Sequence, residues 1–200
     1  MKLLLLLLLM IERMNKDTIA NNMFQIIKEI EADTYNREWL QETPSRVAKA
    51  MEKIFEGYSI YPEDIMTVFD NESKEIDQIV GLSNIEFYSF CEHHILPFFG
   101  KCSVYYIPWD KICGISKLAR IVNIYARRLQ NQERLTKQIA DCIEELLKPK
   151  AVAVVMEWKH FCMLARGVEK QCSVMKTSDI RGKFRDSEKA RAELFRLIWE

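Results

Sequence analysis

The feature that most constrains the fold is an apolar run, AVAVVME at residues 151–157, that follows two amphipathic helical patterns. A short run rich in β-branched residues indicates a strand buried on both faces. Apolar side chains before it recur at helical spacing, first at Leu118, Ile121, Val122, Tyr125 and Leu129, and then at Ile139, Cys142, Ile143 and Leu146. The sequence therefore predicts a pair of helices followed by a buried strand.

The other elements surround this central unit. We predict strands at 84–90, 101–107, 160–165 and 172–178, and helices at 17–30, from 43 to 57 and from about 186 onward. This order of helices, strands, paired helices, strands and helix is typical of an α+β domain. We divide the chain into an apolar N-terminal tail (1–16), an N-terminal helical region (17–70) and a catalytic domain (71–200).

Composition narrows the class of protein. The 200 residues are 48% hydrophobic and carry 29 basic and 29 acidic side chains, so the chain can bury a core and has no overall attraction for nucleic acid. Six cysteines without a CxxC pair fit a reducing cytoplasm. The leucine run that follows Lys2 imitates the start of a signal peptide, but no small-residue cleavage site follows and the run is too short to span a bilayer. We expect a tail there rather than a membrane anchor.

All three histidines fall in two short motifs, CEHH at 91–94 and HFC at 160–162. The spacing of Cys91 and His94 is typical of a zinc chelate, and Cys162 is the best candidate for a third ligand. Two thiolates and one imidazole leave the fourth position of Zn2+ open for water, as in catalytic sites. His93 and His160 would then serve proton transfer. The alternative is a structural metal clip.

A second group of polar residues lies between 114 and 136. Ser116, Lys117 and Arg120 share the start of a predicted helix, where they can converge on a phosphate. Glu133, with Gln132 beside it, offers a carboxylate that can accept two hydrogen bonds from the edge of guanine. A solvated helix face explains the same residues in the absence of a ligand.

Three stretches together resemble the GTP cyclohydrolase I family: SFCEHHILPFFGK, GISKLARIVNIYARRLQNQERLTKQI and HFCMLARGV. The resemblance covers roughly residues 20 to 185 and includes TPSRVAK at 43–49. It implies a tunnelling fold, with an antiparallel sheet and paired helices, that assembles into a toroidal homo-oligomer, commonly a decamer. It also implies the conversion of GTP and water to 7,8-dihydroneopterin triphosphate and formate, the first step of folate and pterin biosynthesis.

The resemblance assigns roles by position. It makes Cys91, His94 and Cys162 the zinc ligands. His160 is expected to protonate N7 of the purine, and His93 to act near the ribose ring oxygen. Gln132 and Glu133 are expected to hold guanine. The triphosphate is expected to lie among Ser116, Lys117, Arg120, Arg166 and Arg46, at an interface between subunits.

Some positions depart from the family pattern. Asn131 stands where an apolar residue is usual, and Trp158 replaces a smaller residue. A non-catalytic, zinc-stabilised assembly module would also keep the three metal ligands, but it would not need His93, His160, Glu133 and Lys117 together. A relative that uses a cysteine nucleophile is a further alternative, and the pairing of CEHH with HxC argues against it.

Overall fold

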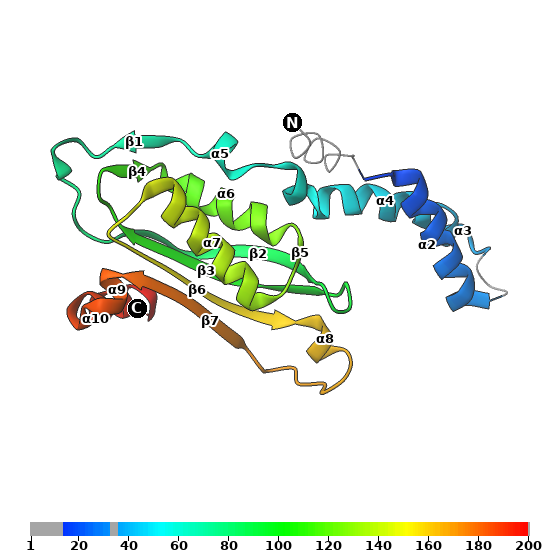
Figure 1. The fold of residues 1–200 in the computed structure, drawn as a ribbon. Helices are drawn as coiled ribbons and strands as arrows, with labels where there is room; N and C mark the ends of the chain where they lie inside the picture. The colour runs from blue at the N-terminus through cyan, green and yellow to red at the C-terminus, as the bar shows by residue number, and fades with distance from the viewer. Residues whose placement is uncertain (1–13, 33–35, 200) are drawn as a thin grey trace, which may run out of the picture. The chain divides into compact units, whose positions relative to one another are not determined.

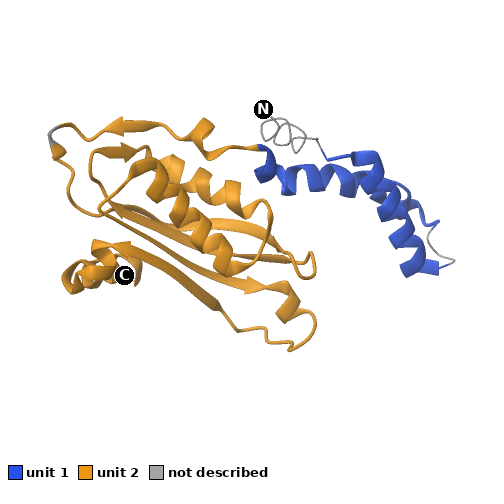
Figure 2. Ribbon diagram, in the orientation of Figure 1, with its two compact units in different colours: residues 1–59 blue, residues 60–200 orange. Residues whose placement is uncertain are grey.

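The computed structural model describes residues 14–32 and 36–199. Its contacts divide the chain into two compact units, residues 1–59 and 60–200 (Figure 2). The predicted apolar tail falls almost entirely outside the described residues. No helix in the described part of the chain has the length and apolar character needed to cross a membrane.

The first unit is helical. Its main helices are α2 (Lys16–Glu31) and α4 (Thr43–Ile54), which pack against each other; the short helix α3 (Glu38–Gln41) lies between them in the chain, and η2 (Glu56–Ser59) follows α4. The Asn15 side chain caps α2 by accepting a hydrogen bond of 2.9 Å from the backbone of Thr18. Both main helices agree with the sequence prediction.

The second unit is built on a five-stranded sheet with the order β5-β2-β3-β6-β7 (Figure 1). The long strands β2 (Val80–Cys91), β3 (Pro97–Ile107), β6 (Ala151–His160) and β7 (Met175–Gly182) pair with one another in antiparallel fashion. The short strand β5 (Leu129–Gln130) pairs in parallel with the end of β2. The sheet is therefore mixed, which corrects the expectation of a purely antiparallel sheet.

Helices α6 (Ile115–Ala126) and α7 (Gln132–Leu147) pack against the sheet and bury their apolar faces in the main core. The central strand β6 is buried over most of its length, as the 151–157 run predicts. A smaller core forms where α9 (Lys183–Asp186) and α10 (Glu188–Trp199) cover one end of the sheet. The segment before β2 contains α5 (Pro62–Ile65), β1 (Val68–Asp70) and η3 (Glu72–Lys74), and β1 pairs with β4 (Lys111–Cys113), a short strand between β3 and α6.

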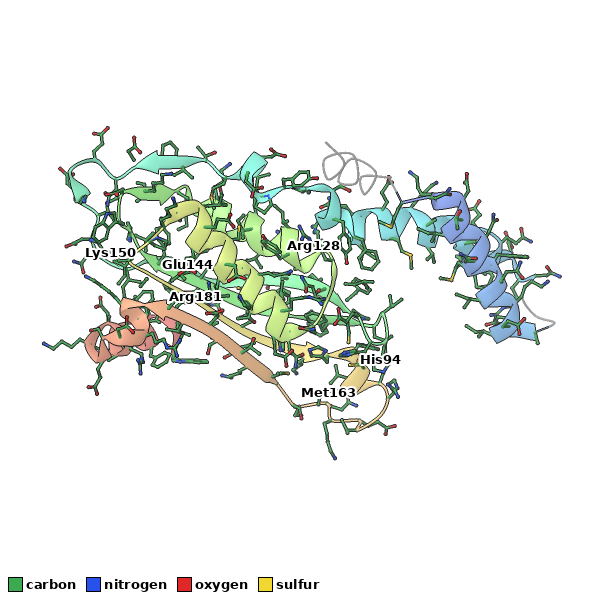
Figure 3. The ribbon with its side chains drawn as sticks, viewed as in Figure 1. His94, Arg128, Glu144, Lys150, Met163 and Arg181 are labelled. Carbon is green, nitrogen blue, oxygen red and sulfur yellow. The ribbon has the colours of Figure 1, made fainter. Side chains whose placement is uncertain are left out.

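Strand β7 is fixed to α7 by a cluster of charges (Figure 3). The Arg181 guanidinium contacts Glu144 at 2.6 Å, Asp141 at 2.7 Å and Asp179 at 2.6 Å. One arginine with several carboxylate partners holds the two elements together at this end.

The predicted strand at 160–165 is wrong beyond its first residue. Strand β6 ends at His160, and Phe161–Leu164 form the short helix α8. His160 pairs with Phe98, and the next partner along β3 would be Pro97, where the strand begins. Because proline has no backbone N–H to donate, the ladder cannot continue past this pair. The chain therefore turns into a helix at Phe161.

Candidate active site

The loop between β2 and β3 carries the CEHH motif. Cys91 is the last residue of β2 and is buried. Its carbonyl oxygen accepts hydrogen bonds from the backbone of His94 at 3.3 Å and of Ile95 at 2.8 Å, and its own N–H donates to Leu96 at 2.9 Å. The chain reverses within these six residues, so the motif is held compactly at the end of the sheet.

The HFC motif lies at the same end of the sheet, where β6 ends. The His160 ring stacks on Phe98, with ring centroids 4.6 Å apart and an interplanar angle of 13°. Cys162 lies in helix α8, which follows at once, and its sulfur is 3.9 Å from His160 Nδ1. Figure 3 shows Met163 of α8 at the same end of the molecule as His94.

One group of side chains can hold a metal ion. The ligand atoms of Cys91, His160 and Cys162 all lie within 4.8 Å of one another. Zinc binds sulfur at about 2.3 Å and imidazole nitrogen at about 2.0 Å, which puts ligand atoms of a tetrahedral site roughly 3.5 to 4 Å apart. Burial and the neighbouring Cys91 raise the pKa of the Cys162 thiol, so metal binding there would displace a proton. The donor set and its spacing fit zinc.

The other two histidines lie on the loop that follows Cys91. His94 Nε2 lies 2.7 Å from Arg166 Nη1, and because arginine only donates, this nitrogen accepts the hydrogen bond. His93 Nδ1 lies 3.6 Å from the Cys91 sulfur. Of the predicted metal ligands, Cys91 and Cys162 thus come together directly, while His94 lies against Arg166.

His160 has one nitrogen available for another molecule. Its Nε2 is buried and has no hydrogen-bond partner among the described residues. Burial lowers the pKa of His160, while the charge of Glu133 opposes that shift and His93 adds to it. A buried, unpartnered nitrogen next to a metal-capable group can exchange a proton with a ligand bound there.

The first turn of α7 carries the predicted guanine-binding residues. Glu133 is exposed and lies near enough for its charge to act on His160. Gln132 is half-buried, and its amide contacts the sulfur of Met175 on β7. A buried imidazole and two thiols therefore meet at one end of the sheet, within range of the charge of the Glu133 carboxylate.

The predicted phosphate-binding residues of α6 do not join this group within one chain. Ser116, Lys117 and Arg120 lie on the first turns of α6, whereas β5, which follows that helix, pairs with Cys91. The nine steps from Lys117 to Ala126, the last residue of the helix, correspond to roughly 14 Å at about 1.5 Å per residue. Ser116 and Lys117 thus lie at the end of α6 that is farther along the helix from Cys91.

Arg46 lies on α4 in the first unit, where its guanidinium pairs with Glu42 at 2.7 Å. Arg166, in contrast, is at the site through its contact with His94.

Sequence reasoning missed Glu92 and Arg134, whose side chains form an ion pair between the CEHH loop and α7. The missed signal was Asn131, an N-cap residue directly before the helix. Asn131, which departs from the family pattern, caps the N-terminus of α7 and donates a hydrogen bond to Glu92.

Comparison with known proteins identifies the family. The family model described as GTP cyclohydrolase I matches residues 19–199. The protein named "GTP cyclohydrolase 1" of Wolinella succinogenes is 54% identical over 162 residues, covering 80% of this chain and 86% of that protein. Its namesake in Methylococcus capsulatus is 51% identical over 176 residues, covering 87% and 93%. The chain therefore belongs to the GTP cyclohydrolase I family of hydrolases.

Proposed function

We propose that the protein hydrolyses GTP at C8 in a zinc-dependent reaction that yields 7,8-dihydroneopterin triphosphate and formate. Two water molecules add in turn at C8, the two C8–N bonds break and C8 leaves as formate. The ribose carbons then close the new ring with loss of water, so that one water is consumed overall. The observation that carries the proposal is the meeting of Cys91, Cys162 and His160 beside Glu133 at one end of the sheet.

We propose Cys91, His94 and Cys162 as the zinc ligands. When bound, zinc would supply Lewis-acid activation of the attacking water. The two thiols lie in the metal-capable group, whereas His94, three residues after Cys91, is outside it; its Nε2 accepts a hydrogen bond from Arg166 that it would have to release in order to bind the metal. His160 also reaches the thiols through Nδ1, so a substitution must separate the two histidines.

The remaining histidines move protons. His160 donates to N7 of the purine, which makes C8 more electrophilic, and its buried Nε2 is available for this contact. The stack on Phe98 fixes the plane of the ring and thus the direction of the proton. His93, exposed on the same loop, acts as an acid at the ribose ring oxygen.

Glu133 and Gln132 recognise guanine from the first turn of α7. The carboxylate of Glu133 accepts hydrogen bonds from N1–H and from the exocyclic amino group. The charge of Glu133 acts on the pKa of His160, which supports a purine that contacts both residues. The pyrimidine edge of the purine would then lie on α7 and its C8 at the thiols.

The triphosphate needs residues from more than one copy of the chain. Arg166 is at the site, whereas Ser116 and Lys117 start α6 at the end farther from Cys91. We propose that a neighbouring subunit supplies Ser116, Lys117 and Arg120 and that Arg46 adds charge. We further propose that the assembly is a toroidal homo-oligomer, a decamer as the family resemblance implies. Six free thiols suit work in a reducing cytoplasm, at the first step of folate and pterin biosynthesis.

The direct test is formate release from GTP by the purified full chain, with zinc and after chelation. We expect formate and a new pterin absorbance in equal amounts, both lost on chelation and restored by zinc. A folded, zinc-loaded oligomer that releases no formate would refute the enzyme proposal and favour the assembly module.

Replacing Glu133 with glutamine should weaken GTP binding by about 10- to 100-fold, because one of two acceptors becomes a donor that opposes the guanine edge. Inosine triphosphate, which lacks the exocyclic amino group, is the matched ligand. The unaltered protein should prefer GTP over inosine triphosphate, and Glu133→Gln should lose most of that preference. Equal discrimination before and after the substitution would remove Glu133 from guanine recognition.

A further inference from the structure

A hydrogen-bonded network joins the CEHH loop to the start of α7. Glu92 Oε1 accepts a hydrogen bond of 3.0 Å from Asn131 Nδ2, and Glu92 Oε2 accepts one from Arg134. Arg134 also donates to the Gln130 side chain and to the Leu129 carbonyl, each at 3.0 Å. The backbone N–H of Glu92 donates to the Gln130 carbonyl at 3.0 Å. Backbone and side-chain bonds thus hold the loop against the same short segment.

Asn131 has two functions in this network. Its Oδ1 accepts a hydrogen bond of 2.9 Å from the backbone of Arg134 and so caps α7, while its Nδ2 donates to Glu92. Aspartate and serine also cap helices, but aspartate has no donor and serine is shorter. An apolar side chain at this position can form neither bond.

The network lies between the two halves of the site. Cys91 and His93 flank Glu92 on the loop. Gln132 and Glu133 lie in the sequence between Asn131 and Arg134, the two residues that contact the Glu92 carboxylate. An exposed single ion pair contributes little, but an arginine with three acceptors fixes geometry as well.

We propose that Asn131 is a positioning residue that, through Glu92 and with Arg134, sets the placement of the CEHH loop relative to Glu133. The inference rests on the proposed function, because the purine must reach from Glu133 to the thiols and histidines. A small displacement between these elements would leave guanine bound and misplace C8. Errors of about 1 Å in such a geometry can cost up to about 100-fold in rate.

The test uses Asn131→Asp and Asn131→Ser in the full chain. Both keep a capping oxygen, but aspartate has no donor and the serine side chain is shorter than the distance that Asn131 Nδ2 spans to Glu92. We expect kcat for formate release to fall about tenfold in both, with KM for GTP within about twofold and an unchanged melting temperature. Amide hydrogen exchange in residues 91–96 should become about tenfold faster. Asn15→Asp, the same change at the N-cap of α2, is the matched control and should change neither kcat nor the amide exchange of residues 91–96.

Unchanged exchange in residues 91–96 in both variants would overturn the inference, as would an unchanged kcat in both. A lower melting temperature with an unchanged kcat would reduce Asn131 to a helix cap. If the unaltered chain releases no formate, the proposed function fails with the catalytic part of this inference. The exchange measurement would then still decide whether Asn131 holds the loop to α7.

Discussion

Cys162→Ala is expected to remove the bound zinc and to lower formate release from GTP by about 10³-fold or more. The thiol lies with Cys91 and His160 in the one group of described residues found with metal-ligand geometry. Without its metal, the site would have to use ordinary water, whose pKa lies far above that of water bound to zinc. Zinc content per chain, measured by mass spectrometry of the metal, and formate release are the two readouts.

The matched control for this substitution is Cys172→Ala. Cys172 is a free and exposed thiol outside the metal-capable group, so its removal should leave zinc content and formate release as they were. Cys162 is itself only partly buried, and we expect the Cys162→Ala chain to fold. A Cys162→Ala protein that keeps a full complement of zinc would contradict the assignment of Cys162 as a ligand.

The parts of the fold that sequence could predict are those with a local period. Helices α6 and α7 and strand β6 each carry their own pattern of apolar side chains, and all three were predicted. The failure at 161–164 has a non-local cause, because the end of β6 depends on where its partner β3 begins. Strand β5 has two residues and exists only through its pairing with β2, so no local pattern marks it.

The candidate site divides in the same way. Residue type and spacing were enough to identify Cys91 and Cys162 from chain segments about seventy residues apart. Spacing could not show that Arg166 reaches His94, or that Arg134 reaches Glu92, because both contacts depend on how the loops fold back. Nor could spacing show that α6 begins at the end of the helix farther from Cys91. That placement leads to the proposal that two subunits share one active site.

His160→Ala is expected to keep zinc and to lose formate release by about 10²- to 10⁴-fold, the range typical of a general acid. His94→Ala is the matched variant and should lose the zinc itself. The structure makes this pair decisive, because His160 Nδ1 lies 3.9 Å from the Cys162 sulfur while His94 contacts Arg166. Loss of zinc from His160→Ala with retention in His94→Ala would exchange the two roles.

Added imidazole separates the two roles further. In His160→Ala the ring that stacks on Phe98 is missing, so free imidazole has an aromatic surface on which to bind beside the thiols. Because a general acid need not be attached to the chain, imidazole should restore part of the formate release at constant zinc content. The recovered rate should follow the concentration of the protonated form, falling as pH rises through the pKa of imidazole. Rescue that instead appears only together with regained zinc would make His160 a ligand.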